Sequence, residues 1–129
     1  MTFCSIYVQS QFIAFHRWEQ APQEVGFLAS WHRHIFKVRV DLQVLHNDRG
    51  LEFFLVQKDL NASLDLWREK KVYKSCEMFC EDIFEALSPK YPSLFRVEVS
   101  EDGENGAVIL RNFPSAGPTP LFPFPKTSE

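Results

Sequence analysis

Residues 31–46 read WHRHIFKVRVDLQVLH, and apolar residues occupy every second position after a pair of histidines. This alternation predicts a long strand with one apolar face and one mostly polar face. Side chains two residues apart diverge by about 200° on a helix, whereas on a strand they share a face. The strand therefore places His32 and His34 side by side at the start of its apolar face.

The segment before it, residues 4–18, alternates in the same way and predicts a second strand. A loop over residues 19–30, EQAPQEVGFLAS, joins the two strands. If they pair as neighbours, the end of the first strand meets the start of the second. His16 then lies next to His32 and His34.

Three imidazoles that converge from two strands have two interpretations. Neutral imidazoles suit zinc or a similar borderline metal with an open coordination position, which is typical of catalytic sites. A histidine can also be an ordinary polar residue with a hydrogen-bond partner. Spacing alone leaves both interpretations of His16, His32 and His34 open.

The composition indicates one folded domain without an electrostatic partner. The chain has 129 residues, of which 45% are hydrophobic, and a formal net charge of -3. That length is enough for a hydrophobic core, and that charge argues against general nucleic-acid binding. An odd number of cysteines, no cationic apolar leader and no run of about 18 apolar residues favour a cytoplasmic protein without a membrane span.

The rest of the pattern predicts two helices followed by two short strands. Apolar residues recur at helical spacing over 55–67 and again over 76–87, where Ser75 is suited to cap the helix N-terminus. Alternation over 94–100 and 107–112 predicts the strands. The order indicates an α+β fold in which helices cover one face of an antiparallel sheet.

The end of the chain has a different composition. We divide the protein into a domain over residues 1–112 and a proline-rich tail over 113–129, which holds five of the eight prolines. Proline lacks an amide N–H and cannot continue a helix or a sheet ladder, so the tail is expected to be extended or disordered. It is either flexible or anchored by its phenylalanines on its own subunit, a neighbouring subunit or another protein.

Four segments together resemble one family of enzymes. They are FIAFH at 12–16, HRHIFKVRV at 32–40, the serine-x-glutamate that opens a helix at 75–77, and VEVSE at 97–101. In this order they look like the 6-pyruvoyl-tetrahydropterin and 6-carboxy-tetrahydropterin synthases. The similarity runs from about residue 3 to residue 112 and excludes the tail.

The resemblance implies the tunnelling fold, a four-stranded antiparallel sheet with two helices inserted between strands two and three. It also implies homotrimers whose sheets join into a barrel, commonly stacked as homohexamers, with sites between subunits. By the same resemblance His16, His32 and His34 hold zinc, and a pterin or purine-like small molecule binds beside it. Glu101 matches the glutamate that anchors the pterin edge, and Glu77 matches a glutamate at the start of a helix in the site.

The resemblance fails at the catalytic positions. Family enzymes place a general-base cysteine in the first loop, four residues before the histidine pair, where this chain has Leu28. A glutamate substitutes in some relatives, but the nearest acid upstream, Glu24, is out of register. Asp65 is the candidate for the aspartate of the family's Asp-His dyad, and no histidine follows His46. The glycine between the paired histidines is Arg33 here.

Two functions therefore remain open. The first is a divergent synthase-like protein with zinc and a pterin-like pocket which, if active, is a zinc-dependent lyase acting on 7,8-dihydroneopterin triphosphate. The second is a catalytically silent module that uses the same fold to engage a small ligand or a partner protein.

Overall fold

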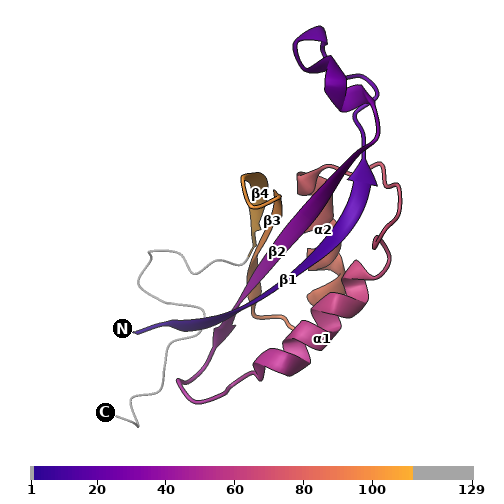
Figure 1. The fold of residues 1–129 in the computed structure, drawn as a ribbon. Coiled ribbons are helices and arrows are strands. Elements are labelled where there is room, and N and C mark those ends of the chain that lie inside the picture. Colours follow the sequence, from indigo (N-terminus) through magenta and orange to yellow (C-terminus); the bar gives the residue numbers. More distant parts are fainter. Residues whose placement is uncertain (1, 112–129) are drawn as a thin grey trace.

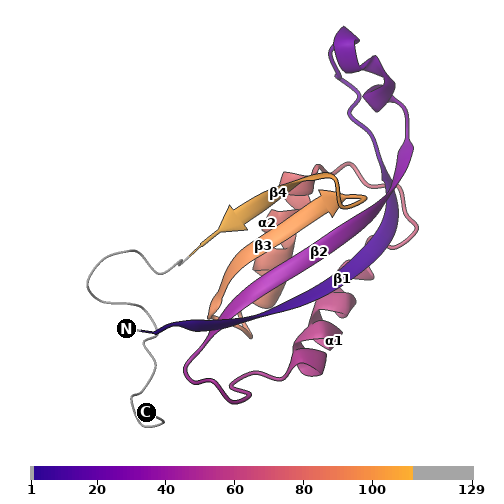
Figure 2. The ribbon, with the colours of Figure 1, turned by 60° about the vertical axis from the view of Figure 1, so that its left-hand side comes forward.

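The computed structural model describes residues 2–111 and contains one four-stranded antiparallel sheet with two helices. The strands are β1 (Cys4–His16), β2 (His32–Val44), β3 (Leu94–Glu101) and β4 (Asn105–Leu110), in the spatial order β1-β2-β3-β4. The helices α1 (Phe53–Leu64) and α2 (Cys76–Leu87) lie between β2 and β3 in sequence. Both cover the same face of the sheet (Figures 1 and 2). This confirms the predicted tunnelling fold; the tail predicted at 113–129 lies outside the described residues.

The core lies between the sheet and the two helices. Phe12 of β1 stacks on Phe36 of β2 at 5.1 Å between ring centroids, and Phe79 of α2 packs its ring against both. All three are at most 1% exposed. Burying one such side chain stabilises the fold by about 1.5–3 kcal/mol, so this cluster holds α2 against the strands that carry the histidines.

The sequence predicts that the first strand ends at residue 18 and that the second begins at residue 31, and both positions are wrong. β1 ends two residues earlier, and β2 begins one residue later. β1 stops at His16 because the chain turns away from the sheet there, and the amide of Trp18 donates to the Leu28 carbonyl at 2.7 Å. The loop that follows contains a short 3-10 helix, Gln23–Ala29. This loop projects beyond the end of the sheet (Figure 1).

The first helix also begins earlier than its apolar pattern predicts. It starts at Phe53, and the Glu52 side chain caps it by accepting a hydrogen bond from the Leu55 amide at 3.0 Å. Phe53 and Phe54 are exposed and lie off the buried stripe, so the spacing of core residues does not reveal them. The cap predicted for the second helix is confirmed, since Ser75 Oγ accepts from the Met78 amide at 3.2 Å.

The chain after α1 runs along the outer edge of β1. Phe15 donates its amide to the Lys70 carbonyl at 2.9 Å, and its own carbonyl accepts from the Val72 amide at 2.8 Å. The Glu69 amide donates to the Ile13 carbonyl at 2.7 Å. These bonds cover the C-terminal half of an otherwise open strand edge and bring the start of α2 to the end of the sheet where the histidines lie.

None of the helices within residues 2–111 is long and apolar enough to span a membrane.

Candidate metal centre

Strand pairing places the three histidines in one cluster. His16 pairs directly with His32 in the antiparallel register, and His34 lies two residues further along β2 on the same face. The ring centroids of each pair are 4.5 to 5.2 Å apart, and the rings stand steeply to one another. One nitrogen from each ring lies within 4.8 Å of the others. The structure thus brings together the residues that the sequence placed together.

The other nitrogen of each ring, Nδ1, contacts an atom that can only accept a hydrogen bond. The partners are the Lys74 carbonyl at 2.8 Å for His16, the Ser30 carbonyl at 2.8 Å for His32, and Asp102 Oδ2 at 2.7 Å for His34. A neutral imidazole carries one N–H, so these contacts place it on Nδ1 and leave the Nε2 lone pair free. Such outer contacts are typical of histidines that bind metals. The donor set therefore fits a metal ion held by three Nε2 atoms.

Burial favours the neutral form that a metal ligand needs. His16 is 8% exposed, and its pKa is lowered chiefly by desolvation, with repulsion from His32 and His34 in the same direction. The Lys74 carbonyl and the charge of Glu101 oppose this shift in pKa without reversing it. The ring of Phe36 packs edge-on against His16 and closes the core side of the cluster.

Glu101, the last residue of β3, points at the histidines. Its Oε2 lies 3.1 Å from His16 Nε2, and its Oε1 lies 3.6 Å from His34 Nε2. The sequence resemblance implies that Glu101 binds the edge of the pterin. In the structure its carboxylate instead faces the Nε2 atoms of His16 and His34. The next residue, Asp102, holds His34 from the other side of the ring.

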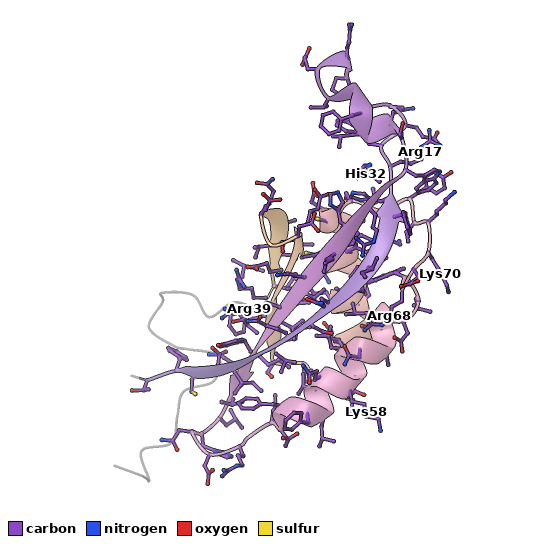
Figure 3. The ribbon with its side chains drawn as sticks, in the orientation of Figure 1. Arg17, His32, Arg39, Lys58, Arg68 and Lys70 are labelled. Atoms are coloured by element: carbon purple, nitrogen blue, oxygen red, sulfur yellow. The ribbon has the colours of Figure 1, made fainter. Side chains whose placement is uncertain are left out.

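A cavity of about 650 Å³ opens beside the cluster. His16, His32 and Glu101 line it, and Glu77 lines it from the first turn of α2. The lining also includes apolar and aromatic side chains, among them Trp18, Leu28 and Tyr73, and charged ones, among them Arg17, Glu19 and Lys74. His32 lies where the projecting loop leaves the sheet, close to Arg17 (Figure 3), whose Nε donates to the Ala29 carbonyl at 2.7 Å and ties down the loop.

The cavity lacks an obvious proton-transfer group where the family resemblance requires one. Leu28, which stands where the resemblance places the base, lines it and offers no acid or base. Cys76 also lines it, but burial raises the pKa of this thiol to about 12. Glu24 is exposed and outside the lining. Asp65 caps the end of α1 and pairs with Arg68 at 2.6 Å, so it is not in the site.

Sequence reasoning missed the groups that orient the rings. Asp102 looks like an ordinary residue of an acidic turn, and only its place directly after the third strand marks it as a neighbour of the histidine pair. The Ser30 and Lys74 carbonyls belong to the backbone, which leaves no signal in the sequence. Arg33, predicted to point away from the histidines, is exposed.

Solved structures share this fold at low sequence identity. A 6-pyruvoyl tetrahydropterin synthase from Caenorhabditis elegans matches with a TM-score of 0.68 and 18% identity, over 86% of this chain and 97% of that one. A Plasmodium vivax 6-pyruvoyltetrahydropterin synthase with a mutated catalytic glutamate gives 0.65 and 16%, over 88% and 100%. The Plasmodium falciparum enzyme gives 0.62 and 13%, over 86% and 99%.

No protein-family model matches the sequence, and no curated protein matches it. At these identities the structural matches establish that the chain has the fold of the 6-pyruvoyl-tetrahydropterin synthases. The function has to be argued from the site.

Proposed function

We propose that this chain is a zinc-binding, 6-pyruvoyl-tetrahydropterin synthase-like protein that takes a pterin-like molecule in the cavity beside the metal. One observation carries the proposal: one ring nitrogen of each histidine lies within 4.8 Å of the others, while each Nδ1 is held by a hydrogen-bond acceptor. Rings oriented in this way lose little freedom when they bind a metal. The fold shared with the synthases supports the choice of ligand.

Zinc is the metal that best fits the donor set. Borderline imidazole nitrogens suit zinc better than magnesium or calcium, which prefer oxygen ligands. When bound, zinc would supply Lewis-acid chemistry to oxygen atoms of a substrate side chain. The residues of the chain orient the three rings through the contacts of their Nδ1 atoms.

The cavity has the size and lining of a small-molecule site. Its volume of about 650 Å³ lies within the usual range for ligand pockets, roughly 300–1,000 Å³. Trp18 and Tyr73 offer flat surfaces to a planar ring. The carboxylates of Glu77 and Glu101 can each accept paired hydrogen bonds from the guanidine-like edge of a pterin. Because Glu101 faces the histidines, we assign the pterin edge first to Glu77.

Turnover of 7,8-dihydroneopterin triphosphate is expected to be slow or absent. The position of the family's base is the apolar Leu28, and the Cys76 thiol stays protonated near neutral pH because its pKa is about 12. This observation favours a second candidate function, a catalytically silent module that binds a small ligand or a partner protein. The two candidates share the metal and the cavity and differ in whether the ligand reacts.

We further propose a homotrimer, or a homohexamer of two trimers. β1 and β4 are the outer strands of the sheet, and the segment after α1 covers only the C-terminal half of the β1 edge. Pairing the first half of β1 with β4 of a neighbouring subunit would satisfy open backbone groups and close a barrel. Light scattering of the purified protein tests this, and a particle of the monomer mass at all concentrations would contradict it.

One preparation tests the main proposal. The protein is purified without added metal, its metal content is measured, and co-purifying small molecules are identified by mass spectrometry. We expect about one zinc per chain and a bound pterin. The zinc-loaded protein is then given 7,8-dihydroneopterin triphosphate. Triphosphate release would identify the enzyme, whereas binding without release would identify the silent module. Zinc content near zero, with no uptake on titration, would refute the metal centre.

A further inference from the structure

We propose that Glu101 is a fourth protein ligand of the metal centre, so that three histidines and one carboxylate close the site in the absence of substrate. The inference rests on the proposed metal centre and concerns its coordination. It assigns Glu101 to the metal rather than to the pterin edge.

The distances from Glu101 to two of the three histidines, His16 and His34, are close to those of neighbouring ligands on one ion. Zinc–nitrogen bonds of about 2.0–2.1 Å in a tetrahedral site place adjacent donor atoms about 3.3 Å apart. The Glu101 oxygens lie 3.1 Å from His16 Nε2 and 3.6 Å from His34 Nε2. The first distance is slightly shorter than the expected distance of about 3.3 Å and the second is slightly longer. The carboxylate therefore lies on the side of the cluster formed by His16 and His34, from which it could reach an ion that these rings hold.

The contacts around the cluster leave a place for a cation between these atoms. Because Nδ1 of His16 contacts the Lys74 carbonyl and Nδ1 of His34 contacts Asp102, the ring protons lie on Nδ1. The Nε2 atoms of His16 and His34 then face the two oxygens of the Glu101 carboxylate, an arrangement of donor atoms that a metal ion between them would join. The nearby Lys74 side chain is engaged elsewhere, with Asp82 at 2.6 Å. A divalent metal shared by the nitrogens and the carboxylate accounts for the arrangement.

The sheet fixes the carboxylate in this place. Glu101 pairs with Phe36 in the β2–β3 register, and cross-strand partners point to the same face of a sheet. That face also carries His34 and, through β1, His16. A second backbone link follows directly, since the Asp102 amide donates to the Ile35 carbonyl at 2.8 Å. A ligand on a paired strand is positioned more accurately than one on a loop.

A site with four protein ligands behaves differently from one with three. Catalytic zinc sites usually keep a position for water or substrate, whereas four protein ligands are typical of closed sites. A substrate oxygen would have to displace Glu101 before it reached the metal. Together with Leu28 at the position of the base, this makes the resting centre unreactive.

Cobalt replaces zinc in the test, because its visible spectrum reports the number and kind of its ligands. Azide is added to the cobalt-loaded wild-type protein and to the Glu101→Ala, Glu101→Gln and Glu104→Gln variants. Glu104 lies in the same turn and serves as the matched control. We expect azide to leave the spectra of wild type and Glu104→Gln unchanged and to shift that of Glu101→Ala. Zinc affinity, measured against a chromophoric chelator, should fall by about 100-fold or more in both Glu101 variants and remain at the wild-type value in Glu104→Gln.

The outcomes separate this inference from the metal centre itself. Wild-type protein that binds cobalt and shifts its spectrum with azide would keep the three-histidine site and overturn the fourth ligand, and this measurement needs no variant. Zinc affinity of Glu101→Gln equal to that of wild type would overturn it as well. Failure of the wild-type protein to bind either metal would instead refute the proposed centre. Circular dichroism of each variant verifies that the fold is intact.

Discussion

Asp102 accepts a hydrogen bond from His34, with 2.7 Å between Oδ2 and Nδ1. Its other oxygen, Oδ1, accepts from the Ile35 amide at 2.9 Å. The Ile35 N–H and then His34 hold the pKa of this carboxyl below its ordinary value, so Asp102 is ionised near neutral pH. A carboxylate in this position fixes the ring and makes its free nitrogen a stronger donor to a metal.

Replacing Asp102 by asparagine should weaken zinc binding without disturbing the turn. Asp102 has a φ of 59°, a left-handed conformation that asparagine tolerates well. The amide keeps the shape but loses the negative charge that supports His34, so zinc affinity should fall by about 10- to 100-fold. Competition with a chromophoric chelator measures the zinc affinity. Asp48→Asn, in the exposed turn after β2, is the control. Unchanged affinity in Asp102→Asn would show that the contact does not support the ligand.

Only one of the three cysteines should react in the native protein. Cys76 and Cys80 are buried, and burial raises the pKa of the first thiol to about 12 and that of the second to about 11. Because the thiolate is the reactive form, iodoacetamide near pH 7 should modify Cys4, which is partly exposed, and spare the other two. Mass spectrometry of native and denatured samples counts the adducts. Rapid modification of native Cys76 would reveal an activated thiol in the cavity and a possible base.

The histidine cluster could be predicted from sequence because strand geometry is simple. Residues two apart on a strand lie on the same face of the sheet. When one loop joins two neighbouring antiparallel strands, the end of the first strand lies beside the start of the second. These two rules brought His16 to His32 and His34 without any knowledge of the helices. The same alternation could not show where β1 ends, since Trp18 keeps the parity of the strand although its amide already bonds to the loop.

The contacts around the histidine cluster could not be predicted in the same way. The direction of the Glu101 carboxylate depends on how β3 pairs with β2, a register that links residues 65 positions apart along the chain, from Phe36 to Glu101. The Lys74 carbonyl reaches His16 only because the segment after α1 follows the edge of β1. Such contacts arise from tertiary structure, and local periodicity carries no information about them.

Removing the hydroxyl of Tyr91 should lower the stability of the fold by an amount that depends on pH. Tyr91 donates to Asp59 Oδ2 at 2.5 Å, and Lys90 lies 2.9 Å from the same oxygen. The hydrogen bond from Tyr91 makes the largest contribution to lowering the pKa of Asp59 below 3.8, and Lys90 makes the next largest. A lowered pKa means that the ionised carboxylate stabilises the fold above pH 3.8 and that this stabilisation is lost as the pH falls through the lower folded value.

Tyr91→Phe should therefore lower the free energy of unfolding by about 1 kcal/mol near pH 7, a modest value because Asp59 is partly exposed. The difference from wild type should shrink as Asp59 becomes protonated in acid. Urea unfolding at several pH values measures it. Tyr7→Phe, which removes the hydroxyl of an exposed tyrosine, is the control. An equal loss at every pH would assign the effect to packing rather than to the charged hydrogen bond.

Placing a cysteine at Leu28 should not create an efficient synthase. Leu28 lines the cavity, so Leu28→Cys would put a thiol where the resemblance expects the base. That thiol would have no imidazole to activate it: three of the four histidines form the cluster, and His46 accepts from the Asp48 amide in the turn after β2. An unassisted thiol has a pKa near 8.5 and is only a few per cent ionised near pH 7.

Positioned acid–base groups each contribute about 10²–10⁴-fold to a rate, and a metal alone does not replace them. Triphosphate release from 7,8-dihydroneopterin triphosphate is measured for zinc-loaded wild type, Leu28→Cys and Leu28→Ala, the last to separate added space from added thiol. We expect all three to be slow or inactive. Rapid release by Leu28→Cys alone would mean that a single substitution removed the base from an otherwise complete site, and rapid release by wild type would mean that the chain supplies its base from a residue other than Leu28.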